Sequence, residues 1–160
     1  TAGVIAGAIN NLYFAEETTS ADGVTTTVPI SANRLLSFAK IDMPEIFARS
    51  LENPFMAGLL GESGSSATPF LILKVSDYDT GLAGILAGER SLVRLFDTIF
   101  GTRIQASGIE FRDTVILGKD ARVFDVISGT TIIYSFVNPN TIVIAGSRSA
   151  LETLLPHLAK

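Results

Sequence analysis

Short runs of β-branched and aromatic residues alternate with turn residues along most of the chain, which predicts a sheet built from hairpins. The clearest example is the run Thr131–Val137, followed by Asn138-Pro139-Asn140 and a second apolar run, Thr141–Ala145. β-branched and aromatic side chains suit a pleated surface. Proline fixes φ and asparagine tolerates left-handed backbone, so the three residues between the runs predict a tight turn.

The same order of strand, turn, strand, capping residue and helix recurs three times. The units span about 8–52, 55–100 and 131–159, and a further hairpin is expected within 109–127. They share a pattern and not residue identities. Because hairpins dominate, we expect one α+β domain over residues 1–160, with a mainly antiparallel sheet and helices packed on one face.

Turn and capping residues set the expected limits of these elements. In the first unit the strands are expected at Ala8–Phe14 and Val24–Ile30, joined by a long turn rich in Thr, Ser, Asp and Gly. Ser76 or Asp77 can cap the helix of the second unit, since short polar side chains satisfy free amides at a helix start. In the third unit, Ser147 or Ser149 can do the same.

The strongest helix signal lies in the middle of the chain. Apolar residues at three- and four-residue steps predict one helix over Tyr78–Phe100, and Gly101 follows at the expected C-terminal stop. Gly84 and Gly88 lie on one face of this helix, although each costs roughly 1 kcal/mol against alanine. A close approach of another helix or of the sheet would explain both glycines.

The composition argues against several classes of function. The 160 residues include 12 Lys and Arg against 16 Asp and Glu, a net charge of -4. Nucleic-acid binding is therefore not expected, because it needs a basic surface. The chain has no cysteine, which excludes disulfides and thiolate chemistry. No apolar run reaches the roughly 18 residues of a membrane-spanning helix.

The sequence predicts no catalytic residue, no cofactor and no metal site. His157 is the single histidine and stands near the end of the last predicted helix. There we interpret it as a surface residue that complements the helix dipole. Four aspartates lack the spacing of a calcium loop, and caps and turns explain them better: Asp77, Asp79, Asp113 and Asp120.

Glu89 interrupts the apolar stripe of the central helix and is the most informative charged residue. A buried carboxylate needs a partner, which Arg112 or Arg122 of the neighbouring hairpin could supply. With Asp120, these residues form a candidate polar cluster. A structural ion pair, or a Glu89 that tilts out of the stripe, is the favoured interpretation. The alternative is a cleft around Glu89 that binds or processes a small molecule or a cell-wall fragment.

The first nine residues are apolar and small, and we consider them a candidate interaction strand. Val4, Ile5 and Ile9 are its larger side chains. Such a segment could pair with the sheet edge of another chain and so mediate self-association or binding to a partner protein.

Several motifs together resemble a known but uncharacterised family. They are Gly7–Tyr13, Phe55-Met56-Ala57-Gly58, Pro69–Lys74, Ala83–Glu89, Phe111–Ile116, Asp120–Val123, Ile133–Phe136 and Asn140–Ile144. They are similar to motifs in predicted single-pass membrane proteins of candidate-phyla, Patescibacteria-type bacteria. The resemblance covers nearly the whole chain. It implies a domain outside the cytoplasm, attached to the membrane through a segment that this chain does not include.

One position departs from that family pattern. Its members often carry Trp before the helix glutamate, where this chain has Gly88. From the residues and the resemblance together, we expect a non-catalytic extracytoplasmic interaction or assembly module of a cell-envelope or surface structure.

Overall fold

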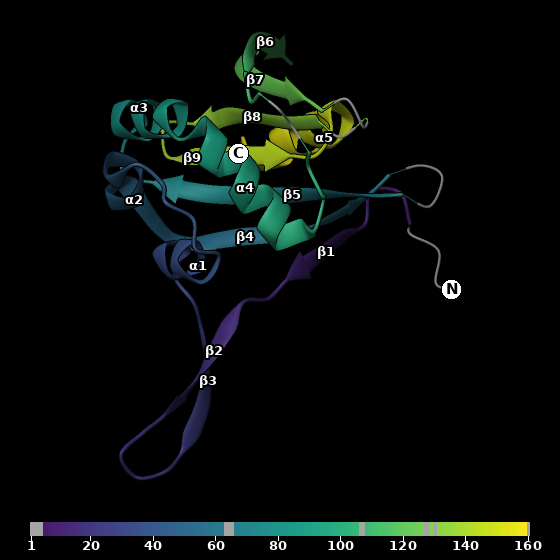
Figure 1. The fold of residues 1–160 in the computed structure, drawn as a ribbon. Helices are drawn as coiled ribbons and strands as arrows, with labels where there is room; N and C mark the ends of the chain where they lie inside the picture. Colours follow the sequence, from purple (N-terminus) through teal and green to yellow (C-terminus); the bar gives the residue numbers. More distant parts are fainter. Residues whose placement is uncertain (1–4, 63–65, 106–107, 127–128, 130, 160) are drawn as a thin grey trace.

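Strands from distant parts of the chain are joined into one sheet by antiparallel pairing (Figure 1). The computed structural model of the protein describes residues 5–62, 66–105, 108–126, 129 and 131–159. In chain order, the elements are β1 (Ile9–Leu12), β2 (Ala15–Thr19), β3 (Thr25–Pro29), α1 (Ala32–Phe38), α2 (Glu45–Ser50), β4 (Leu51–Gly61), β5 (Ala67–Val75), α3 (Tyr78–Ala87), α4 (Glu89–Phe100), β6 (Arg112–Ile116), β7 (Lys119–Asp125), β8 (Thr131–Asn138), β9 (Thr141–Ala145) and α5 (Arg148–Leu158).

The main sheet has seven strands in the order β1-β4-β5-β9-β8-β7-β6. Each neighbouring pair is antiparallel. The hairpins β4–β5 and β8–β9 meet through their inner strands, where Phe70 lies opposite Ala145. The prediction of an α+β fold with a mainly antiparallel sheet is confirmed.

The central strands are apolar on both sides, so the sheet has two buried faces. Successive side chains of a strand point to opposite faces. Leu71 and Leu73 of β5 belong to one buried cluster, whereas Phe70 and Ile72 belong to the other. We call the side of Leu71 the front face and the side of Phe70 the back face.

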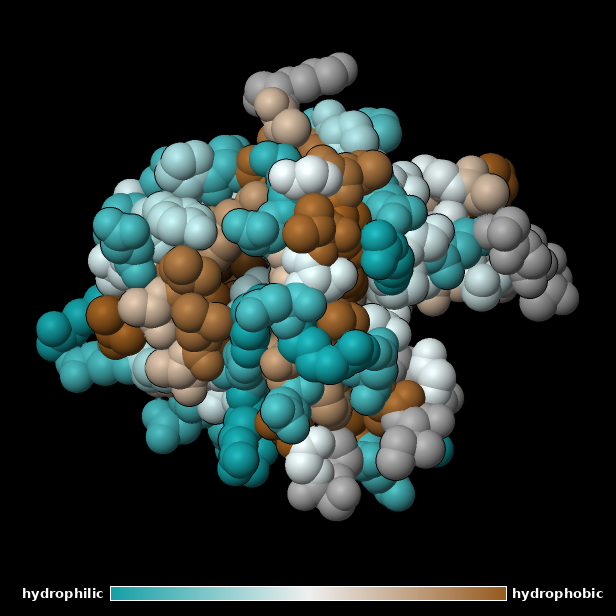
Figure 2. Space-filling model, turned by 90° about the horizontal axis from the view of Figure 1, so that it is seen from above, coloured by the Kyte–Doolittle hydropathy of each residue, from teal (hydrophilic) through white to brown (hydrophobic). Residues whose placement is uncertain are grey.

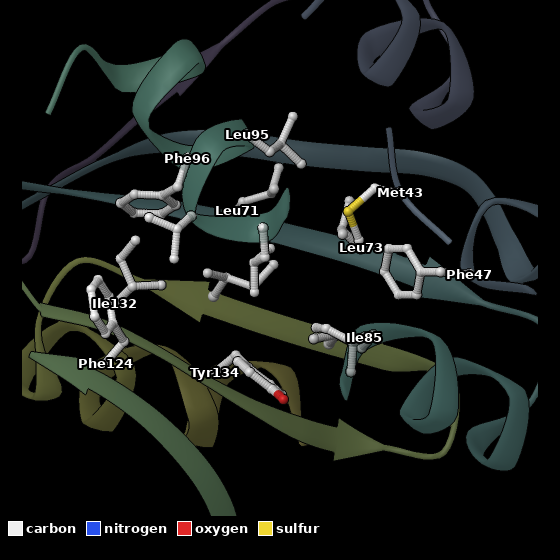
Figure 3. Packing of buried hydrophobic residues seen from close by; sticks show 14 of the residues in the cluster. Met43, Phe47, Leu71, Leu73, Ile85, Leu95, Phe96, Phe124, Ile132 and Tyr134 are labelled. Carbon is white, nitrogen blue, oxygen red and sulfur yellow. The ribbon is translucent and has the colours of Figure 1, made fainter. Parts of the chain in front are cut away.

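Helices cover both of these faces, whereas the sequence pattern had predicted helices on one face only. The front cluster contains side chains of α1, α2, α3 and α4, and Figure 3 shows Phe47 and Phe96 among the strand residues that they cover. Among the described residues, α5 is the helix that closes the back cluster, through Leu151, Leu154 and Leu155. The reason is that every residue of β9 is buried, so both faces of this strand need cover.

The first unit differs from the prediction. β1 pairs with β4, with Ile9 opposite Leu60, and does not pair with the strand that follows it. Residues expected in a turn form β2, which pairs with β3 as a separate two-stranded sheet. We call this hairpin the arm, because it projects from the body in Figure 1. Its residues are exposed apart from half-buried Glu16, so no apolar stripe marked them as part of a core.

The long central helix is divided in two at Gly88. This residue has φ -100° and ψ 9°, ends α3 and begins α4, so the two helices run in different directions in Figure 1. A Cβ at Gly88 would lie 2.8 Å from Cε of Met43 and 2.9 Å from Cδ of Pro44. The break therefore lies where the segment before α2 crosses the helix pair.

The predicted caps are present where the helices begin and end. Asp77 accepts a hydrogen bond from the amide of Thr80 at 2.8 Å, and Ser147 accepts one from the amide of Ala150 at 3.0 Å. The amide of Thr80 lowers the pKa of Asp77. Gly101 ends α4 with φ 63°, in the left-handed region that favours glycine.

Substitution of Gly84 tests the close approach of α2 to α3. A Cβ here would lie 2.6 Å from Cβ and 2.7 Å from Cα of Phe47, so the backbone of α2 would have to move. Overpacking costs about 1–3 kcal/mol, whereas the gain in helix propensity is about 1 kcal/mol. We expect Gly84→Ala to lower the free energy of unfolding by about 1 kcal/mol in urea denaturation.

Gly108→Ala is the matched control, because nothing lies within 4 Å of the added carbon. It should leave the urea midpoint almost unchanged. Equal stability of the two variants would contradict the close packing of α2 on α3.

Candidate functional site

A groove of about 1130 Å³ lies on the front face, between α3 and the β6–β7 hairpin. Tyr78, Leu82 and Leu86 of α3 line one side, at four-residue steps along the helix. The other side and the base come from the hairpin and from β8, with Val115, Asp113, Asp120, Arg122, Tyr134 and Phe136. Figure 2, which looks onto the molecule from above the view of Figure 1, shows hydrophobic side chains on both sides of a hollow.

The groove exposes large apolar side chains to solvent. Leu86 is 41% exposed and Val115 is 57% exposed. Near the turn between β8 and β9, the ring of Tyr78 packs edge-on against Phe136, with centroids 4.8 Å apart. Two apolar sides joined by an aromatic contact therefore form a concave apolar surface.

Near the other end of α3 lies an ion pair that joins α4 to the sheet. Glu89 is the first residue of α4. Nε of Arg122 donates to Oε1 of Glu89 at 2.6 Å, and Nη2 donates to Oε2 at 3.1 Å. The hydroxyl of Tyr134 donates to Oε1 at 2.8 Å. The carboxylate thus receives three hydrogen bonds, in the bidentate geometry that favours arginine.

Arg122 makes two further hydrogen bonds. Nη1 donates to Oδ1 of Asp113 at 2.7 Å, and Nη2 donates to the carbonyl oxygen of Phe111 at 3.2 Å. The side chains of Arg122 and Glu89 are 25% and 15% exposed, so the pair is largely shielded from water. The guanidinium therefore holds α4, β6 and the segment before β6 against one another.

The pKa values of two groups shift in the direction that this network requires. The hydrogen bond to Glu89 raises the pKa of Arg122. Burial raises the pKa of Tyr134, and its hydrogen bond to the Glu89 carboxylate raises it further. Figure 3 shows the Tyr134 ring at the margin of the front cluster. At neutral pH, Arg122 stays charged and Tyr134 stays a neutral donor, so neither group is poised to accept a proton.

The structure brings together only part of the polar cluster predicted from the sequence. Arg122 is the partner of Glu89, whereas Arg112 pairs with Asp125 on the exposed surface. Asp120 lines the groove two residues from Arg122, but among the described residues it forms no ion pair. Sequence reasoning missed the roles of Asp113 and Tyr134. The signal for Tyr134 was weak, because a tyrosine in an apolar strand is usually interpreted as a residue of the hydrophobic core.

The candidate interaction strand is only partly described. Val4 lies outside the described residues, and Ile5 is 74% exposed before the first strand. Ile9 pairs with Leu60 of the same chain, and the amide of Gly7 donates to the carbonyl oxygen of Gly61 at 2.8 Å. The backbone from Gly7 onward thus completes the protein's own sheet, in place of the donated strand that the sequence had suggested.

Other candidate residues have local structural roles. Nδ1 of exposed His157 lies 2.9 Å from the carbonyl oxygen of Thr153, one turn earlier in α5. Within the described ranges, no group of three or more acidic or histidine side chains is arranged to hold a metal ion. In the same ranges, no helix is both long and apolar enough to cross a membrane.

The turn of the β6–β7 hairpin carries an unusual exposed leucine. Leu117 and Gly118 have φ 50° and 76°, and Ile116 pairs with Lys119 on either side of them. This is a two-residue turn, which normally favours Asn-Gly. Leu117 is 61% exposed and occupies backbone space that costs a non-glycine residue about 1–2 kcal/mol.

Comparison with known proteins gives no relative for this chain. No protein-family model, no curated protein and no solved structure matches it. Any function therefore has to be inferred from the groove, the ion pair and the open sheet edge.

Removal of one member of the ion pair should destabilise the fold. Arg122→Met leaves the carboxylate of Glu89 shielded and without its ionic partner, which costs about 3–5 kcal/mol in a fully buried pair. Because this pair is partly exposed, we expect Arg122→Met to lower the free energy of unfolding, measured by urea denaturation, by about 2 kcal/mol. The double variant Glu89→Leu/Arg122→Met should recover most of that loss. A double variant as unstable as the sum of both single variants would contradict this coupling.

The raised pKa of Tyr134 predicts a contribution to stability that depends on alkaline pH. Its proton is held more tightly in the folded than in the unfolded chain. The stabilisation is therefore complete below the unfolded pKa of about 10 and declines as the pH rises above it, by up to about 1.4 kcal/mol per pH unit. Between about pH 9 and pH 11, urea denaturation should show that the free energy of unfolding falls less for Tyr134→Phe than for the wild type. Tyr13→Phe, at an exposed position, should follow the wild type.

Proposed function

We propose that this chain is a non-catalytic interaction module that binds a partner polypeptide in the groove between α3 and the β6–β7 hairpin. The single observation that carries the proposal is the groove itself, which has exposed apolar sides and an open strand at its rim. Singly exposed apolar residues are normal on a protein surface, but a concave set of them marks a contact site.

The polar chemistry beside the groove supports binding over catalysis. Both oxygens of Glu89 are occupied by donors from Arg122 and Tyr134. A general base needs a lone pair directed at its substrate, and a general acid needs a proton to give. The network instead has the features of a structural clamp, since each charge in it faces an opposite charge.

The β6–β7 hairpin supports a contact role independently. Leu117 is both strained and exposed, while Asn or Gly would suit its turn better. Backbone strain at an exposed position has no benefit for folding, and such positions are common at sites of binding. Together with Val115 on the preceding strand, Leu117 extends apolar surface from the groove to the tip of the hairpin.

The alternative of a small-molecule or cell-wall-fragment site around Glu89 has less support. Such a ligand would have to compete for a carboxylate that already receives three hydrogen bonds. Small-molecule sites are usually enclosed pockets with a few convergent polar groups that await a partner. The wide groove suits a polypeptide better.

The cellular location is a separate part of the proposal and rests on the family resemblance of the sequence. We infer that the domain lies outside the cytoplasm and belongs to a cell-envelope or surface structure, anchored by a segment outside this chain. Protease treatment of intact cells that express the whole gene product tests this. The domain should be cleaved without lysis, and full protection until lysis would exclude the location.

Selection from a displayed library of random 12-residue peptides tests the groove. Immobilised wild-type protein should enrich peptides with a shared apolar motif. Leu86→Glu places a charge on the α3 side of the groove, and we expect it to bind the selected peptides at least about tenfold more weakly. Fluorescence anisotropy of labelled peptides measures these affinities.

Ile46→Glu is the matched control, because Ile46 is a similarly exposed helix residue, at 46%, outside the groove. It should keep the wild-type affinity. Failure to enrich any peptide, or equal loss of binding in both variants, would count against a polypeptide-binding groove.

A further inference from the structure

We propose that the bound polypeptide is an extended segment that adds as an antiparallel strand to the open edge of β6, with an apolar side chain beside Val115 and a lysine or arginine beside Asp113. This inference rests on the proposed function and specifies its partner. It concerns the conformation and the chemistry of the segment that the groove accepts.

The open edge follows from the order of the sheet. β6 is the last strand, and in the part of the chain that the structure describes only β7 pairs with it. An unpaired edge presents a row of backbone donors and acceptors, which only another extended chain can satisfy in register. β1 is the opposite edge, but it has four residues and does not line the groove.

The register of the hairpin determines which backbone groups face outward. Across a two-residue turn, the flanking residues exchange hydrogen bonds, and the next pair along points its N–H and C=O groups away. Ile116 and Lys119 flank the turn, so Thr114 also faces β7, while Val115 and Asp113 face the open edge. Consistent with this, Nη2 of Arg148 donates to the outward carbonyl oxygen of Val115 at 3.4 Å, and an added strand would replace this long, exposed bond with one from its own amide.

The two residues that direct their backbone outward also direct their side chains to the groove. Asp113 and Val115 both line it, as residues two apart on one face of a strand must. An added strand therefore places every second side chain on the groove side. Val115 offers an apolar neighbour and the groove behind it offers Leu86, so one of these side chains should be apolar.

The charge of the groove rim determines the side chain that the added strand places beside Asp113. The Asp113 side chain is 88% exposed, and Asp120 is an exposed carboxylate across from Val115. Arg122 faces both Glu89 and Asp113, so its single positive charge is shared between two carboxylates. The rim next to Asp113 is therefore acidic, and a cationic side chain two residues from the apolar one complements it. Opposite charges on neighbouring strands contribute about 0.2–1 kcal/mol, whereas like charges oppose pairing.

A synthetic peptide, acetyl-Thr-Val-Thr-Lys-Thr-amide, has this pattern and the length of β6. In antiparallel pairing its Val lies beside Val115 and its Lys beside Asp113. Addition of the peptide to the ¹⁵N-labelled protein should slow the hydrogen exchange of the Asp113 and Val115 amides. The Thr114 amide, which already faces β7, should change little, so it serves as an internal control.

Two N-methylated peptides separate strand addition from other modes of binding. In the added strand, the Val and Lys amides would face β6, so methyl groups on both should weaken binding at least about tenfold. Methyl groups on the central and last Thr amides, which would face away, should be tolerated. Replacement of the peptide's Lys by Glu, or Asp113→Asn in the protein, should weaken binding roughly two- to fivefold.

The failures are distinguishable. If library peptides bind the groove but both methylated forms bind equally, or the Asp113 and Val115 amides gain no protection, strand addition is wrong and the binding function stands. If the synthetic peptide does not bind at millimolar concentration while selected peptides do, the proposed pattern of side chains is wrong. If neither binds, the proposed function fails together with this inference.

Discussion

The fold depends on central strands that are apolar on both sides. Neither face of β5 or β9 can lie in water, because successive residues of both strands are buried on opposite faces of the sheet. In the described part of the chain the helices meet this requirement unequally, with α5 on the back and α1 to α4 on the front. On the front, α3 lies beside the outer strands without covering them, and the groove is the uncovered remainder. The candidate site is therefore a result of how helices are shared between two faces.

The ion pair of Glu89 and Arg122 fixes the geometry at the margin of that groove. Glu89 begins α4, Arg122 lies in β7 and Tyr134 lies in β8, so three elements meet at one carboxylate. A partly shielded pair adds little net stability, because desolvation offsets much of the attraction. Its value is specificity of position, since a shift of α4 would leave a charge without its partner. We therefore regard the cluster as a positioning device for the hairpin.

Sequence reasoning was most successful where the signal was local. The β8–β9 hairpin, the Asp77 and Ser147 caps and the stop at Gly101 follow from residue types within a few positions. The pairing of β1 with β4 and the separation of the arm depend on contacts far apart in sequence, which residue patterns do not encode. For the site, the position of Glu89 in an apolar stripe predicted that its carboxylate has a charged partner. The choice of Arg122 over Arg112 required the strand register.

The arm has a different relation to the rest of the protein. Its strands are held by their own backbone pairs and by threonine contacts such as Thr19 with Thr25, and few of its side chains touch the body. The folding energy of the body is therefore nearly independent of what the arm contains. Its length and tip, around Gly23, are free to diverge between related chains at little cost. In evolutionary terms, selection for folding therefore constrains this ribbon only weakly.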